Sequence, residues 1–157
     1  MIKFSTSGEI YYHPDRAGYL IGYTDDVMKV KFLCSKGIIS DLEMVGGIYR
    51  YTIAEMGGFD FKDYLSGFFG DPAILRKLNY GIHLGSPVSL AILDKLITDT
   101  KLNNGVRNEY VKLKEFSINN ANTDWLYDIN ETQFVRDAGG IIHLIDPIVH
   151  RDLILPL

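Results

Sequence analysis

His143, Asp146 and His150 form the clearest candidate for a metal-binding set in this sequence. They lie at positions i, i+3 and i+7 near the end of the chain. Two imidazoles and one carboxylate suit a transition metal, and a bound metal can activate water for hydrolysis. Pro147 prevents a single helix from aligning all three, so strands on either side of a turn would have to bring them together. The spacing therefore offers a metal-assisted hydrolase as one alternative, with these three residues as the ligands.

Residues 110–118 offer a second kind of chemistry. In a strand, alternation would place Tyr110, Lys112, Lys114 and Phe116 on one face. Aromatic rings stack on bases and lysines contact phosphates, so this face suits single-stranded nucleic acid. However, 16 Lys and Arg against 20 Asp and Glu give a net charge of −4, which removes most of the electrostatic drive toward a polyanion. Nucleic acid is therefore the weaker alternative.

The third feature is the supply of aromatic residues, which comprises ten Tyr, eight Phe and one Trp. Exposed tyrosines anchor protein interfaces because they bury a large area and lose little entropy. We therefore expect a protein-binding surface built from Tyr11, Tyr12, Tyr49, Tyr51, Tyr110, Phe116 and Trp125. Acidic side chains beside them would complement a basic partner.

No catalytic set can be assigned from the remaining motifs. The glycine pairs lack the spacing of a nucleotide-binding loop, and no nucleophile elbow marks a reactive serine. The leading hypothesis is accordingly a non-enzymatic binding protein without a cofactor, of the immunity, inhibitor or phage-accessory type. It docks on another protein through an aromatic and acidic surface.

Short strands joined by turns are predicted for the first third of the chain. Their residues are β-branched or aromatic, and the predicted ranges are 10–13, 19–23, 27–33, 38–44 and 48–53. None of the gaps between these ranges is long enough for a crossover helix. The pattern therefore predicts strands that pair antiparallel with their neighbours in sequence.

Three helices are predicted next, over residues 60–69, 72–79 and 87–102, with Asp60, Asp71 and Ser86 as caps. Residues 103–105, Asn-Asn-Gly, are expected to end the third helix. Strands follow at 110–118, 125–129, 133–136 and 141–145. The order predicts one α+β domain over residues 1–157, with a mostly antiparallel sheet from N- and C-terminal strands and the three helices packed on one face.

Location and assembly are predicted from the ends of the chain and from the single cysteine. The first nine residues lack the apolar core of an export signal, and no segment reaches the length of a membrane span. Cys34 cannot form an internal disulfide and is expected to end a buried strand. We therefore expect a cytoplasmic protein without a membrane partner. The apolar residues 153–157 would be buried in the core or in a homodimer.

Overall fold

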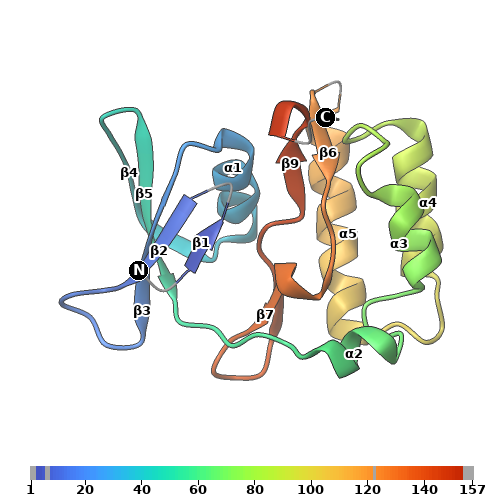
Figure 1. The fold of residues 1–157 in the computed structure, drawn as a ribbon, viewed down its shortest axis with the longest axis horizontal. Helices are drawn as coiled ribbons and strands as arrows, with labels where there is room; N and C mark the ends of the chain where they lie inside the picture. Colours follow the sequence, from blue (N-terminus) through green and yellow to red (C-terminus); the bar gives the residue numbers. More distant parts are fainter. Residues whose placement is uncertain (1–2, 6–7, 122, 154–157) are drawn as a thin grey trace. The chain divides into compact units, whose positions relative to one another are not determined.

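The computed structural model describes residues 3–5, 8–121 and 123–153. The chain divides into two compact units, Met1–Met56 (unit 1) and Gly57–Leu157 (unit 2), and both contain strands and helical structure (Figure 1). The predicted α+β class with antiparallel pairing is confirmed. The expectation that residues 1–157 form one domain stays a prediction.

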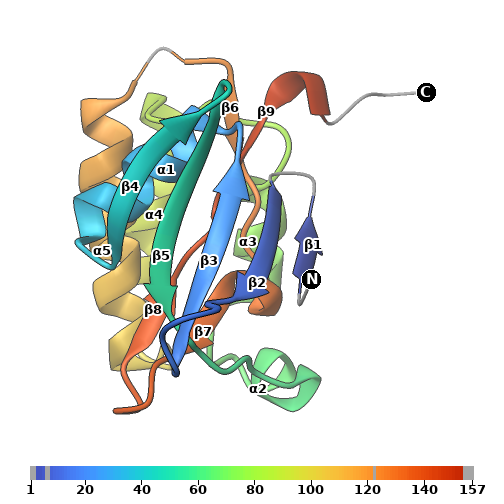
Figure 2. The same ribbon diagram turned by 90° about the vertical axis from the view of Figure 1, so that its left-hand side faces the viewer.

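The described residues of unit 1 form a five-stranded sheet with one helix. The strands are β1 (Lys3–Ser5), β2 (Gly8–Tyr12), β3 (Tyr19–Thr24), β4 (Ile39–Val45) and β5 (Ile48–Ala54), in the order β1-β2-β3-β5-β4. Every neighbouring pair is antiparallel. Because β3 and β4 both run antiparallel to β5, they are parallel to each other, so the chain must cross the sheet between them. Helix α1 (Val27–Lys36) makes this connection and lies along one face of the sheet (Figure 2).

The predicted strand over residues 27–33 is wrong, because local signals at both ends favour the helix. Asp26 Oδ1 accepts hydrogen bonds of 3.0 Å from the backbone N–H groups of Met28 and Lys29, which caps the first turn. Gly37 ends the helix with a φ of 67°, where glycine is favoured. The helix leaves Cys34 exposed rather than buried. Helix α1 is also a crossover connection between strands, which the prediction of pairing between sequence neighbours had excluded.

One close approach defines the two faces of this sheet. Gly22 on β3 pairs with Tyr51 on β5, and a Cβ atom on Gly22 would lie 2.2 Å from Cζ of the Tyr51 ring. Only glycine allows the ring to lie across β3 in this way. Tyr51 is 2% exposed, which indicates that its face is the one beneath α1. The side chains of Ile21 and Tyr23, which alternate with Gly22, therefore point to the opposite face.

In the part of unit 2 that the structure describes, four α-helices combine with two small sheets. The helices are α2 (Phe61–Leu65), α3 (Pro72–Leu78), α4 (Pro87–Ile97) and α5 (Asn104–Asn119). Strand β6 (Trp125–Tyr127) pairs with β9 (Ile148–His150), and β7 (Phe134–Arg136) pairs with β8 (Ile142–Leu144). Two short 3₁₀ turns are η1 (Glu131–Gln133) and η2 (Arg151–Leu153). The C-terminal strands thus form their own two-stranded sheets instead of extending the N-terminal one.

The three predicted helices are present, with Asp60, Asp71 and Ser86 at their N-caps as expected. The first and third end earlier than predicted, at Leu65 and Ile97. None of the helices within the described ranges combines the length and the apolar composition needed to cross a lipid bilayer.

The predicted strand over residues 110–118 is wrong, because this segment belongs to α5. Asn103, expected to end the preceding helix, instead begins α5: its Oδ1 accepts hydrogen bonds from the N–H groups of Gly105 and Val106. The helix buries Val106, Tyr110 and Leu113, which are spaced three or four residues apart. The helical spacing of these apolar residues, and not the alternation of Tyr, Lys and Phe, therefore determines the secondary structure of this segment.

Candidate functional site

An open hollow of about 520 Å³ lies on the unit 1 sheet. Its volume falls in the range of cavities that hold small ligands or side chains. Three tyrosines, one carboxylate and three apolar residues line it, namely Glu9, Tyr11, Tyr12, Pro14, Ile21, Tyr23 and Ile48. Two of the predicted interface residues, Tyr11 and Tyr12, therefore belong to one concave site.

The register of β2 and β3 brings the lining residues together. Tyr11 pairs with Ile21, and Glu9 pairs with Tyr23. Since side chains alternate along a strand, these four residues share one face, opposite to Tyr51. Ile21 is 7% exposed and forms the base of the hollow. Tyr12, which is 65% exposed, lies at its rim.

Two aromatic rings and a carboxylate meet in one corner of this hollow. The rings of Tyr11 and Tyr23 are perpendicular, with centroids 5.9 Å apart and an interplanar angle of 83°. Tyr11 Oη donates a hydrogen bond of 2.6 Å to Glu9 Oε2. This bond, followed by partial burial and the charge of Glu9, raises the pKa of Tyr11 above its ordinary value. The corner is electron-rich, and it suits a cation or N–H donors more than an anion.

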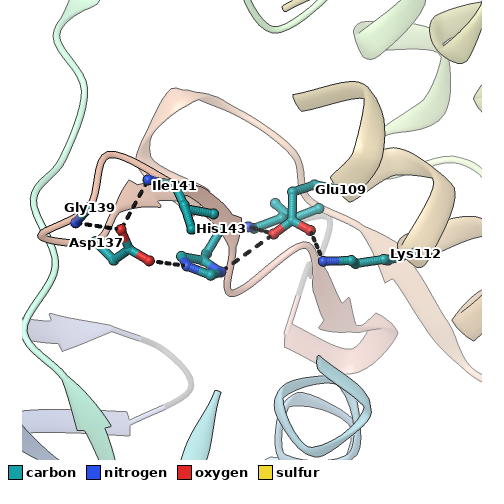
Figure 3. Close-up of polar contacts among 7 residues, drawn as sticks. Glu109, Lys112, Asp137, Gly139, Ile141 and His143 are labelled. Carbon is teal, nitrogen blue, oxygen red and sulfur yellow. Dashed lines mark hydrogen bonds and ion pairs between the residues drawn. The ribbon is translucent and has the colours of Figure 1, made fainter. Parts of the chain in front are cut away.

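A second polar cluster lies within unit 2, around the buried carboxylate of Glu109 (Figure 3). Glu109, on α5, is 1% exposed, and its Oε1 accepts a 2.7 Å hydrogen bond from the backbone N–H of Leu144 on β8. Its Oε2 lies 3.4 Å from Nζ of Lys112, one helical turn away. These contacts attach the β7–β8 hairpin to α5 and compensate a buried charge.

His143 extends this cluster to the turn of the hairpin. Its Nδ1 lies 4.0 Å from Glu109 Oε1, and its Nε2 lies 3.0 Å from Asp137 Oδ2. Asp137 Oδ1 also accepts hydrogen bonds from the N–H groups of Gly139 and Ile141. The hydrogen bond from His143, supported by those from the backbone, lowers the pKa of Asp137. The imidazole is thus held between two carboxylates and ties the turn to the helix.

The structure does not bring the three predicted metal ligands together. His143 pairs with Asp137, whereas His150 packs edge-on against Trp125, with centroids 5.0 Å apart. His150 Nδ1 accepts a hydrogen bond from the N–H of Asp152. Across residues 3–5, 8–121 and 123–153 there is no group of three or more His, Cys, Asp or Glu side chains that could hold a metal ion. The metal site of His143, Asp146 and His150 therefore stays a prediction that the geometry does not support.

Three of the seven predicted interface residues are core residues. Tyr51, Tyr110 and Phe116 are 2%, 0% and 6% exposed, so the expectation that they form a binding surface is wrong. Tyr51 packs over Gly22, while the other two lie on the buried side of α5. Tyr49 and Trp125 are half-buried, in unit 1 and unit 2 respectively.

The predicted nucleic-acid face is also absent from α5. Tyr110 and Phe116 point into the core, and the two lysines are engaged in ion pairs. Lys112 pairs with Glu109, and Lys114 Nζ lies 2.5 Å from Asp94 Oδ1. A helix places residues two positions apart on different sides, so these four side chains cannot form one stacking surface.

Two features of these sites were missed by reasoning from the sequence. Pairing residues 8–12 with residues 19–24 would have placed Glu9 and Tyr23 beside Tyr11, because the connecting turn limits the register. Glu109 lies on the same face of α5 as its buried apolar residues, and a charged residue at such a position indicates a buried partner. Its contacts with Leu144 and His143 depend on tertiary packing and leave no local signal.

Comparisons with protein-family models, with curated proteins and with solved structures gave no match for this chain.

Proposed function

We propose that the chain is a non-enzymatic protein-binding module that docks on its partner through the hollow of unit 1. The observation that supports this proposal is the concave cluster of Tyr11, Tyr12 and Tyr23 beside the carboxylate of Glu9. The protein would be of the immunity, inhibitor or phage-accessory type and would act in the cytoplasm, as the sequence predicts.

The composition of the hollow is typical of a binding interface. Tyrosine contributes a large contact area and a hydroxyl group while few torsions are restricted on binding. Ile21 and Ile48 add apolar area, and the rim residue Tyr12 is accessible to a partner. Together with the net charge of −4, the carboxylate of Glu9 favours a partner with a basic surface.

Selection from a random displayed peptide library tests this proposal without knowledge of the native partner. The purified full chain should enrich a set of peptides, and Tyr11→Ser should abolish their binding because it removes a wall of the hollow. The matched control is Tyr80→Ser, which changes a tyrosine that is 52% exposed in unit 2. Failure to enrich any peptide, or equal loss of binding in both variants, would contradict docking at this hollow.

A further inference from the structure

We infer that the hollow receives the charged end of one lysine or arginine side chain from the partner protein. This inference rests on the proposed function and specifies the chemical group that the hollow recognises. It depends on the arrangement of Glu9, Tyr11 and Tyr23 rather than on the acidity of the whole chain.

The two rings provide the walls that a cation requires. A cation is attracted to the face of an aromatic ring because the π electrons make that face negative. Tyr11 and Tyr23 stand at 83° to each other, so a cation in the corner between them contacts ring surface on two sides. A flat sheet surface with parallel rings would offer one contact at a time.

Glu9 supplies the formal charge. Its Oε2 accepts the hydrogen bond from Tyr11, which fixes the carboxylate beside the rings. A carboxylate has about four acceptor positions, so this single bond leaves capacity for an ammonium or guanidinium group. The phenol hydrogen points toward Glu9, and Tyr11 is protonated at neutral pH because a tyrosine has an ordinary pKa near 10 and that of Tyr11 is raised further.

A positive charge on the neighbouring strand is already compensated. Arg50 on β5 is the register partner of Tyr23, and its Nε lies 3.4 Å from Glu43 Oε1 on β4. This ion pair directs Arg50 toward β4 and away from Glu9, which pairs with Tyr23 from the opposite side. The corner therefore keeps its negative character.

The rim suits the aliphatic stem of a basic side chain. Lysine and arginine carry three or four methylene groups that pack on apolar surface while the charged end contacts polar groups. Pro14 and Ile48 line the hollow together with the base residue Ile21. A volume of about 520 Å³ accommodates the stem and the charged end without rearrangement of the strands.

A peptide titration monitored by NMR tests the inference. The probe is a blocked pentapeptide with lysine between glycines, and its partner probe has norleucine, which has the same stem and no charge. We expect the lysine peptide to shift the ring signals of Tyr11 and Tyr23 and to bind at least about fivefold more tightly than the norleucine peptide. Raising the salt concentration should weaken the binding of the lysine peptide alone.

Two charge variants separate a local effect from a general one. Glu9→Gln should weaken lysine-peptide binding about threefold to fivefold. Glu55→Gln changes the net charge equally at an exposed position outside the hollow, and it should leave the affinity unchanged. Tyr23→Leu should reduce the affinity about fivefold or more because one wall is lost.

The outcomes also distinguish this inference from the proposed function. Equal affinity for the lysine and norleucine peptides, with shifts at Tyr11 and Tyr23, would overturn cation recognition and leave protein binding at the hollow intact. Equal effects of Glu9→Gln and Glu55→Gln would likewise overturn it. Failure to enrich any peptide, or peptide binding that is equally affected by Tyr11→Ser and Tyr80→Ser, would contradict the proposed function itself.

Discussion

The carboxylate of Glu109 on α5 accepts the backbone N–H of Leu144 on β8 at 2.7 Å, 35 residues further along the chain. Among the described residues, strand β8 is three residues long and pairs with β7, and the bond to Glu109 joins this short hairpin to α5. Removing a buried carboxylate that accepts a backbone hydrogen bond is costly, because the backbone N–H is then left buried without an acceptor. Glu109 is therefore a strong structural link between the hairpin and the helix.

Replacing Glu109 by leucine should destabilise the protein by about 2–3 kcal/mol, because the N–H of Leu144 loses its acceptor and Lys112 loses its counter-charge. Glu109→Gln keeps an oxygen for Leu144 and should cost less, about 1 kcal/mol. Urea denaturation followed by circular dichroism measures both changes. The control is Glu115→Leu at an exposed position of the same helix, where the change should be within about 0.5 kcal/mol. Equal losses at both positions would contradict a specific role for Glu109.

The contact between Asp137 and His143 predicts a dependence of stability on acid pH. The folded state lowers the pKa of Asp137 below its ordinary value of 3.8, chiefly through the hydrogen bond from His143. A lowered folded-state pKa means that the ionised carboxylate stabilises the fold above pH 3.8, and that this contribution is lost as the pH falls through the folded value. The unfolding midpoint of the wild type should therefore exceed that of Asp137→Asn near pH 5, and the difference should shrink toward pH 2.

Asp152→Asn provides the comparison for this experiment. Asp152 also neighbours a histidine, with Oδ2 3.6 Å from Nδ1 of His150, but its side chain is 83% exposed. Solvent screens such a pair, so its stability difference from the wild type should be small at every pH. If the difference in unfolding midpoint between the wild type and Asp137→Asn stayed constant between about pH 5 and about pH 2, the effect would not be due to ionisation of Asp137.

The class of the fold and much of its order followed from local patterns. Turn residues and β-branched runs predicted β2, β3, β4 and β5 within a few residues, and proline or aspartate caps predicted α3 and α4. These signals are short-range, since each depends on residues within one turn. Helices α1 and α5 were missed because alternating side chains imitate a strand there, although Asp26 and Asn103 stand at their N-caps.

The candidate site was predictable only in part. Tyr11 and Tyr12 were identified by type, but their partners in the hollow follow from the pairing of β2 with β3. A strand over residues 110–118 predicts Tyr110 on an exposed face together with Lys112, whereas helix α5 places it in the core. Residue type indicated binding, whereas register and helix phase decided which aromatic residues are available for it.

Gly22 should not tolerate a side chain while Tyr51 is present. The added Cβ atom of Gly22→Ala would lie 2.2 Å from Cζ of Tyr51, so the variant should lose about 1–3 kcal/mol of unfolding free energy. Tyr51→Leu removes the obstructing ring but leaves a cavity of its own. The double variant should therefore lose at least about 1 kcal/mol less than the sum of the two single variants.

A control for this cycle is Gly58→Ala, where an added Cβ atom meets nothing within 4 Å. Its unfolding free energy should stay close to that of the wild type. Additive losses for Gly22→Ala and Tyr51→Leu would contradict the close approach of the strand and the ring.

The hydroxyl group of Tyr127 connects three segments of unit 2 and should be sensitive to deletion. Tyr127 is 0% exposed, and its Oη donates to Ser117 Oγ on α5 at 2.8 Å while accepting the N–H of Gly85 at 3.2 Å. Tyr127→Phe keeps the ring, so the measured loss reports the hydroxyl group alone. We expect Tyr127→Phe to lower the free energy of unfolding by about 1–3 kcal/mol, because the buried groups that contact the hydroxyl lose their partner without gaining water. Tyr80→Phe removes a hydroxyl group that bonds Asp128 at a residue 52% exposed, and its loss should be smaller. If both substitutions had the same effect in urea denaturation, burial of the Tyr127 hydroxyl group would not be the cause.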